Sequence, residues 1–172
     1  VLDITQLQME SLTDGVQKYA SQWFRLDQRY RKFVYHLRES GQASLLGELA
    51  MQVENLYCNN YLSRLNDRWQ QHVDAAQQWE AAPVVLQRNF FSRYVQPFVE
   101  RRTKVCVLIS DAFRYEVGEE LQSLIRQEDR FEADLEPMLS MLPSYTQLGM
   151  AALLPNSSLQ LADNDSGDAI VD

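Results

Sequence analysis

Residues 105–116 read VCVLISDAFRYE, and residues 139–150 read LSMLPSYTQLGM. Each stretch opens with a short apolar run of strand length and then changes to helical spacing, so each predicts a strand followed by a helix. The run Val105–Ile109 is continuously apolar, which predicts a strand buried on both faces of a parallel sheet. Asp111 and Thr146 occupy the two strand-to-helix corners. Polar groups at such corners gather at the sheet edge where α/β folds bind ligands.

The carboxylate of Asp111 has two interpretations. Carboxylate oxygens suit Zn²⁺, Mg²⁺ or Mn²⁺, so Asp111 is a candidate metal ligand. Aspartate is also a favoured helix N-cap, and a helix starting at Ala112 would use it in that way. The two roles are compatible, because a carboxylate has several lone pairs.

Thr146 follows a candidate capping box, in which Ser144 is the cap and Gln147 bonds back to it. This places Thr146 in the first helical turn, where free amides and the positive end of the helix dipole favour a phosphate group. A hydroxyl coordinated to a divalent metal becomes a nucleophile at neutral pH. The alternatives are that Thr146 only fills an ordinary helical turn, or that Ser144 is the nucleophile. Arg114 faces a phosphate or, as we prefer, pairs with one of the acids Glu116, Glu119 and Glu120.

The stretches VLISDAFRYEVGEEL and LSMLPSYTQLGMAALLP together resemble the PglZ domain, a branch of the alkaline phosphatase superfamily found in bacterial phage-defence systems of the Pgl/BREX kind. The resemblance covers roughly residues 98–160. It implies a metal-dependent phosphohydrolase or phosphodiesterase, with a nuclease as one option, in which Asp111 binds a divalent metal and Thr146 is the nucleophile. Zn²⁺ is expected, with Mg²⁺ or Mn²⁺ as alternatives. The remaining Asp and His ligands would follow residue 172, so we expect an inactive fragment that binds metal weakly.

Outside these stretches the chain reads as helical. Apolar residues at heptad spacing from Leu12 to Leu37 predict one helix, which Ser40-Gly41 ends. A second stripe runs from Leu46 to Trp79 and slips near Asn59-Asn60, where we expect a register shift. The two helices would be antiparallel neighbours, and Pro83 would begin a third helix. The predicted fold class is therefore α+α/β: a helical hairpin or bundle over residues 1–100, then the first half of an alkaline phosphatase-like α/β domain with a parallel sheet over residues 101–172.

Composition narrows the function classes. The formal net charge of −8 opposes non-specific attraction to DNA or to an anionic membrane. No apolar run approaches the roughly 20 residues of a membrane helix, and no signal peptide is recognisable, so we expect a cytoplasmic protein without membrane contact. Cys58 and Cys106 read as buried reduced thiols. His36 and His72 read as structural residues. Residues 156–168 read as a loop, and Ile170-Val171 reads as the start of another element.

Three functions compete on this sequence. The first is the phosphohydrolase described above, with nucleic acid or a small phosphoester as substrate. The second is a non-catalytic scaffold whose helical hairpin docks other phage-defence proteins, and an exposed apolar hairpin face would favour it. The third is a receiver-like domain that is phosphorylated on Asp111, and the lack of extra acids before Val105 ranks it last.

Overall fold

The computed structural model describes residues 7–163 and 169–171, and it separates the chain into two compact units. The hairpin unit comprises Val1–Trp79 and Arg114–Leu135, and the motif unit comprises Glu80–Phe113 and Glu136–Asp172. The proposed division between residues 100 and 101 stays a prediction. The helix after Asp111 packs with the hairpin unit, although Asp111 itself belongs to the motif unit.

The first arm of the hairpin runs through α1 (Leu12–Lys18), the π-helical segment η2 (Tyr19–Trp23) and α2 (Phe24–Glu39). Ser11 caps it, because its hydroxyl accepts a hydrogen bond from the Asp14 amide at 3.1 Å. The arm ends at Ser40, and the following Gly41 has φ 62°, a left-handed conformation that glycine adopts without steric cost. The predicted helix and its stop are confirmed.

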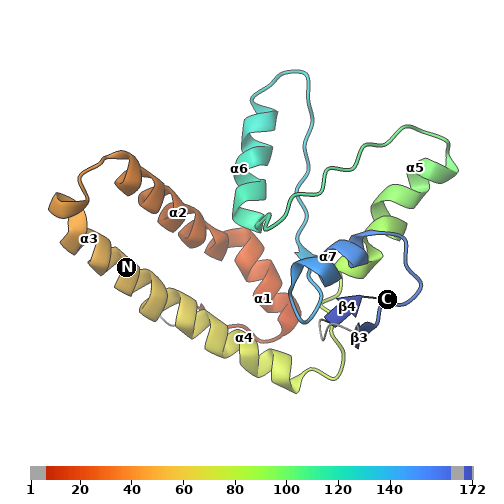
Figure 1. The fold of residues 1–172 in the computed structure, drawn as a ribbon, viewed down its shortest axis with the longest axis horizontal. Coiled ribbons are helices and arrows are strands. Elements are labelled where there is room, and N and C mark those ends of the chain that lie inside the picture. Colours follow the sequence, from red (N-terminus) through yellow and green to blue (C-terminus); the bar gives the residue numbers. More distant parts are fainter. Residues whose placement is uncertain (1–6, 164–168, 172) are drawn as a thin grey trace. The chain divides into compact units, whose positions relative to one another are not determined.

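The second arm runs through α3 (Ala43–Asn55), η3 (Leu56–Leu62) and α4 (Ser63–Ala75). The segment η3 is π-helical and contains Asn59-Asn60, so the slip of the apolar stripe marks a real change of helical register. The two arms lie antiparallel, with α3 beside α2 and α4 beside α1 (Figure 1). The predicted hairpin is confirmed.

Aromatic and small residues hold the arms together. Trp23 and Tyr61 are buried with Leu7 at the centre of the hairpin core. A Cβ atom on Gly15 would lie 3.0 Å from the Trp69 ring, so this close approach requires glycine. The His72 ring contacts the carbonyl oxygen of Met9 at 3.0 Å, in agreement with its predicted structural role. Helix α6 (Tyr115–Arg126) packs on α2 and completes the hairpin unit.

The segment after Pro83 differs from the predicted third helix. It contains the strand β1 (Val85–Leu86), the 3₁₀ turn η4 (Gln87–Asn89), the π-helical segment η5 (Phe91–Val95) and α5 (Gln96–Glu100). The expectation of a helix starting at Pro83 is wrong because the backbone turns there, with a bridge between Ala81 and Val84. Pro97 lies in the first turn of α5, where its missing amide costs nothing.

A parallel sheet is present, but its members differ from the prediction. Strand β1 pairs in parallel with β2 (Met138–Leu139), in the register Val85 with Met138 and Leu86 with Leu139. The predicted buried strand Val105–Ile109 forms neither helix nor strand, and its side chains are exposed. A strand buried on both faces needs hydrogen-bonded neighbours, and the described strands pair only with one another. The thiol of Cys106 is exposed with this segment, so its predicted burial is wrong.

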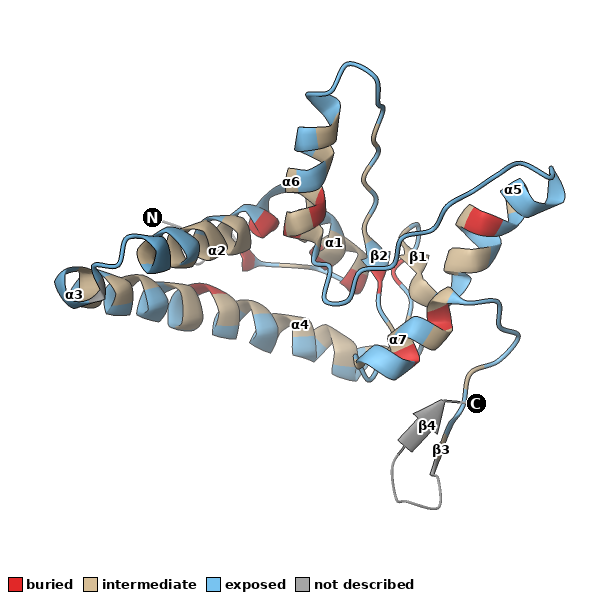
Figure 2. Ribbon diagram, turned by 45° about the horizontal axis from the view of Figure 1, so that its top comes forward, coloured by how far each residue is buried: buried red, intermediate tan, exposed pale blue. Residues whose placement is uncertain are grey.

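The chain then forms α7 (Thr146–Leu153), followed by the antiparallel strands β3 (Leu161–Asp163) and β4 (Ala169–Val171). The predicted loop at residues 156–168 is therefore wrong at β3, and residues 164–168 lie outside the described chain. The prediction of a new element at Ile170-Val171 is confirmed by β4. The buried residues of the motif unit include Leu139 on β2 and Leu148 and Ala152 on α7. Figure 2 colours the buried positions of the described chain red.

Candidate functional site

Asp111 lies in a turn that follows the exposed segment 103–110. Its Oδ1 atom accepts a hydrogen bond from the Ala112 amide at 2.9 Å, and the residue is exposed, so most of its lone pairs remain available to a cation. Ala112 has φ 53°, a left-handed conformation that costs an alanine roughly 1–2 kcal/mol. The helix N-cap alternative is wrong, because α6 begins at Tyr115 and its N-cap is Arg114.

Thr146 is the first residue of α7 and is exposed. The N-cap is Tyr145, which makes no side-chain capping bond, so the predicted capping box with Ser144 as the cap is wrong. The helix begins one residue later than that motif requires, and the Tyr145 carbonyl accepts the first helical bond, from Gly149, at 3.0 Å. Thr146 nevertheless lies in the first turn as predicted, and the amides of that turn have no acceptor within the helix.

Asp111 and Thr146 belong to the same compact unit, but the structure does not join them directly. In the described part of the chain no hydrogen bond links their side chains. Over residues 7–163 and 169–171, no group of three or more His, Cys, Asp or Glu side chains could hold a metal ion. Asp111 therefore fits a metal as a single accessible carboxylate ligand, and a full coordination shell needs further donors. The metal role of Asp111 and the nucleophile role of Thr146 stay predictions.

Arg114 and Glu116, which follow Asp111 in the same motif, are tied to the hairpin instead. Arg114 donates from Nη2 to the Oε1 atom of Glu116 at 2.7 Å, which confirms the preferred pairing of Arg114 with a nearby acid. Glu116 has no exposed surface. Its two carboxylate oxygens also accept from the Nε atom of Arg31 on α2, at 3.0 and 2.9 Å. The sequence around Glu116 does not predict that its carboxylate is buried.

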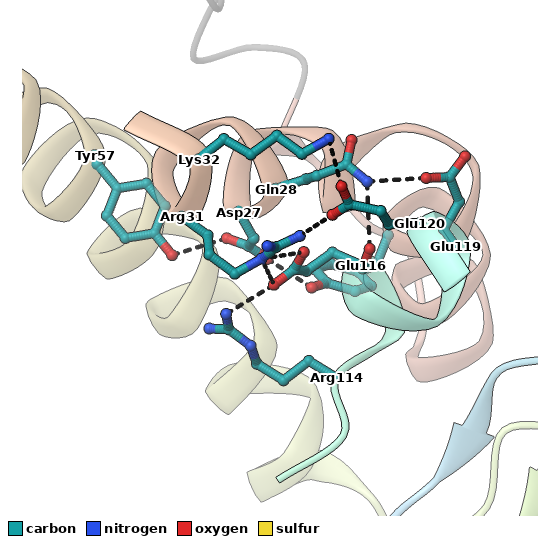
Figure 3. A network of polar contacts seen from close by, with 10 residues as sticks. Asp27, Gln28, Arg31, Lys32, Tyr57, Arg114, Glu116, Glu119 and Glu120 are labelled. Carbon is teal, nitrogen blue, oxygen red and sulfur yellow. Dashed lines mark hydrogen bonds and ion pairs between the residues drawn. The ribbon is translucent and has the colours of Figure 1, made fainter. Parts of the chain in front are cut away.

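The contact between α2 and α6 is a pair of matched polar faces (Figure 3). Three residues of α2, at positions i, i+3 and i+4, face three acids of α6 at the same spacing. Gln28 donates to Glu119 at 2.9 Å, Arg31 bonds both Glu116 and Glu120, and Lys32 pairs with Glu120 at 2.9 Å. Side chains at this spacing share one helix face, so the sequence does contain a signal: a basic run on one helix and acids at matching spacing on another. The residues involved are Gln28, Arg31, Lys32, Glu116, Glu119 and Glu120.

Charge pairing across this contact shifts the pKa values of Glu120 and Arg31. Hydrogen bonds from Arg31 and then Lys32 lower the pKa of the Glu120 carboxyl. The hydrogen bond from Arg31 to Glu120 raises the pKa of the Arg31 guanidinium, so this group stays charged. Glu120 and Arg31 are each about one-third exposed, so solvent screens the pair and the buried carboxylate of Glu116 dominates the energetics.

With this geometry described, comparison with known proteins identifies the class. Residues 90–172 match the family model described as the BREX system PglZ alkaline phosphatase-like domain. Residues 90–172 therefore belong to this PglZ family, which confirms the resemblance of the two motifs. It is 45% identical over 148 residues to the alkaline phosphatase-like protein BrxZ of Escherichia coli O9:H4 (strain HS), covering 82% of this chain and 17% of that protein.

A second relative lies at greater sequence distance. The chain is 37% identical over 153 residues to the alkaline phosphatase-like protein PglZ of Bacillus cereus (strain H3081.97), covering 88% of this chain and 18% of that protein. The chain thus spans less than one-fifth of the length of either relative. No solved structure matches it. None of the helices in the described part of the chain has the length and apolar character needed to cross a membrane.

Proposed function

We propose that this chain contributes Asp111 and Thr146 to a metal-dependent phosphohydrolase or phosphodiesterase acting in phage defence. Membership of an alkaline phosphatase-like family supports the reaction class. The observation that carries the proposal is the position of Thr146: an exposed hydroxyl on the first turn of α7, where helix amides favour an anion. Asp111 offers an accessible carboxylate in the same unit.

The chemistry follows from these two groups. The hydroxyl proton of Thr146 passes to solvent water, and its Oγ atom attacks phosphorus opposite the leaving oxygen, so that the Oγ–P bond forms as the bond to the leaving oxygen breaks. The leaving oxygen takes up a proton from water, and a second water molecule then hydrolyses the phosphothreonine and restores the hydroxyl. The first-turn amides of α7 donate toward the charged phosphate oxygens. A divalent cation, when bound with Asp111 among its ligands, would lower the pKa of the attacking hydroxyl and neutralise phosphate charge. Zn²⁺ is the cation we propose, with Mg²⁺ or Mn²⁺ as alternatives.

Substitution of Thr146 in the full-length protein tests the nucleophile. We expect Thr146→Ala to lower kcat for phosphodiester hydrolysis on the order of 10³-fold or more, since no other group replaces the lost hydroxyl. Ser144→Ala is the matched control, because Ser144 is exposed and also carries a hydroxyl, two residues before Thr146. The Ser144→Ala variant should retain its phosphodiesterase activity. Full activity in Thr146→Ala would exclude this role, and a loss confined to Ser144→Ala would transfer it to Ser144.

The metal role has a separate test. In Asp111→Asn we expect the concentration of divalent cation needed for half-maximal activity to rise about 10-fold or more, because one charged oxygen ligand is lost. Asp129→Asn, an exposed acid outside the motif unit, is the control. An unchanged metal requirement in Asp111→Asn would remove Asp111 from the ligand set.

A scaffold function is the second candidate, and an observation on the second arm of the hairpin favours it. Leu45 and Leu49 on α3 and Leu56 at the start of η3 recur at helical spacing, and their exposed fractions are 77%, 48% and 59%. Exposed apolar residues on one helix face are typical of a protein-binding surface. Other proteins of the defence system are the partners we propose for it. Introduction of a charge by Leu45→Glu and Leu49→Glu should then abolish co-purification with those proteins and leave phosphoester hydrolysis intact.

A further inference from the structure

A single side-chain amide bridges both ends of the segment that carries Thr146. Gln87 is the first residue of η4, directly after β1. Its Oε1 atom accepts a hydrogen bond from the Met141 amide at 3.1 Å, and its Nε2 atom donates to the Gly149 carbonyl at 3.2 Å. Met141 lies two residues past β2, and Gly149 lies within α7. Both ends of residues 141–149 are therefore attached to one half-buried glutamine.

The first of these bonds extends the parallel sheet beyond its last backbone pair. The ladder pairs Leu86 with Leu139, and Gln87 is the residue that directly follows β1. Its backbone enters a 3₁₀ turn, and its side-chain carbonyl accepts from Met141 as the backbone carbonyl of a continuing strand would do. The chain leaving β2 is therefore held in line with the sheet before it turns at Pro143 toward α7.

The second bond depends on glycine at position 149. A Cβ atom at this position would lie 3.2 Å from the Nε2 atom of Gln87 and 3.8 Å from its Oε1 atom. The amide group thus lies directly against the helix backbone, and any side chain at 149 would displace it. Gly149 is three residues from Thr146, so the bond holds the same turn of α7 that presents the hydroxyl.

We propose that Gln87 is a positioning residue for the nucleophile: its two hydrogen bonds fix residues 141–149 and so set where the Thr146 hydroxyl is presented. This inference rests on the proposed function, because it assigns Gln87 a role in the same reaction. Gln87 precedes the stretch that matches the family model, which begins at residue 90. Positioning matters to rate because a displacement of about 1 Å at a reacting group costs up to 10²-fold.

Hydrogen exchange in the full-length protein tests the attachment directly. Gln87→Met keeps the length of the side chain and removes both bonds. The Met141 amide, which loses its acceptor, and the Gly149 amide, whose bond to Tyr145 closes the turn, should then exchange about 10-fold faster or more. Gln96→Met is the matched control, because it removes an exposed glutamine bond to Glu100 in the same unit without touching this segment. If the two variants give the same exchange at Met141 and Gly149, the proposal is overturned whatever the activity.

Kinetics then test the effect on the reaction. We expect Gln87→Met to lower kcat about 10- to 100-fold while KM stays within about threefold, since Gln87 is not proposed to touch substrate. Gly149→Ala, a change that favours helix formation, should reproduce part of this loss by displacing the amide. The double variant should be no worse than Gln87→Met, because both changes remove the same contact. Gly47→Ala, whose Cβ would meet nothing within 4 Å, should have no effect.

The outcomes separate this proposal from the proposed function. A wild-type protein that hydrolyses no phosphoester would contradict the proposed function. Faster exchange in Gln87→Met would still show that the side-chain amide of Gln87 holds residues 141–149. Hydrolysis that depends on Thr146 but has an unchanged kcat in Gln87→Met would overturn the positioning role and leave the function standing. Additive losses in Gln87→Met and Gly149→Ala would overturn it too, because the two residues would then act separately.

Discussion

Glu116 combines a fully buried carboxylate with two arginine partners that remain partly exposed. The side chains of Arg31 and Arg114 have exposed fractions of 34% and 55%, against none for Glu116. Removing a carboxylate from water is costly, and hydrogen bonds from both guanidinium groups offset that cost. The two sides of the pair are therefore unequal: an arginine left alone can bind water, whereas a carboxylate left alone cannot.

This inequality gives an ordered prediction for stability. Arg31→Met should lower the free energy of unfolding by roughly 3–5 kcal/mol, because it leaves a buried carboxylate with one partner fewer. Glu116→Gln should cost only about 1–3 kcal/mol, because the amide oxygen still accepts a bond and the arginines are hydrated. Urea unfolding of the chain measures both. Glu128→Gln, at an exposed acid just after α6, should stay within about 0.5 kcal/mol, and a larger cost for Glu116→Gln than for Arg31→Met would contradict the argument.

Single residues were predictable where the determining pattern is local. Arg114 was expected to pair with a nearby acid, and Glu116, two residues away, is its partner. The burial of that acid depends on Arg31, which is 85 residues from Glu116 in the chain, and no local pattern contains such a pairing. The predicted N-cap of α7, Ser144, is one residue too early, because the extended residue that directly precedes the helix is Tyr145. A capping-box sequence favours a helix start at a given residue but does not determine it.

At the scale of elements, the two π-helical segments of the hairpin contribute tyrosines to one carboxylate. Tyr19 from η2 donates to Asp27 at 2.5 Å, and Tyr57 and Tyr61 from η3 donate to it at 2.9 and 3.4 Å. A π-turn inserts an extra residue and so changes the direction of the side chains around it. The slip in the apolar stripe was readable from sequence, but the convergence of both segments on Asp27 was not.

These hydroxyls give the hairpin a predicted sensitivity to alkaline pH. Burial first, together with the Asp27 charge and hydrogen bonds, raises the pKa of Tyr19, Tyr57 and Tyr61 above the usual value near 10. Above pH ~10 the unfolded chain loses these protons and the folded chain keeps them, so stability is complete below that pH and falls above it. The slope should reach about 1.4 kcal/mol per pH unit for each tyrosine. Tyrosinate absorbance should therefore appear late, together with unfolding.

Removal of one hydroxyl provides the internal comparison for that titration. Tyr57→Phe should shift the midpoint of alkaline unfolding to higher pH, after correction for its effect on stability at pH 7, because one of the coupled protons is gone. Ionisation of Tyr19, Tyr57 and Tyr61 near pH ~10 with the helical signal intact would show that the Asp27 cluster is not closed to solvent.

For the whole molecule, the elements were more predictable than their assembly. The hairpin follows from long apolar stripes, whose period predicts two helices, and from the short connection between them, which makes the helices antiparallel. The motif unit follows less well: β1 was taken for helix, and the run at 105–109 was taken for its central strand. A run of strand-forming residues becomes a buried strand only when neighbouring strands pair with it on both sides. The run itself does not determine whether such neighbours are present. The helix after Asp111 bonds to Arg31 of α2 through Glu116 and lies in the hairpin unit, a contact that the local sequence does not reveal.

The exposed run at 105–109 has a consequence for this chain in solution. Leu108 is 91% exposed, and Val105, Val107 and Ile109 are each more than one-third exposed. Extended segments rich in such residues pair with other copies, and the net charge of −8 opposes this only weakly at physiological salt. We therefore expect self-association that increases with salt, measured by light scattering.

Leu108→Lys should reduce this self-association strongly and change the free energy of unfolding by less than about 0.5 kcal/mol, because an exposed leucine contributes little packing. Leu45→Lys is the matched control, since Leu45 is 77% exposed but lies on a helix whose backbone groups are already bonded. If self-association falls equally in both variants, exposed apolar surface in general is its cause. A reduction confined to Leu108→Lys would instead show that the unpaired backbone of this segment recruits the second copy, which is the behaviour expected of a strand without its neighbours.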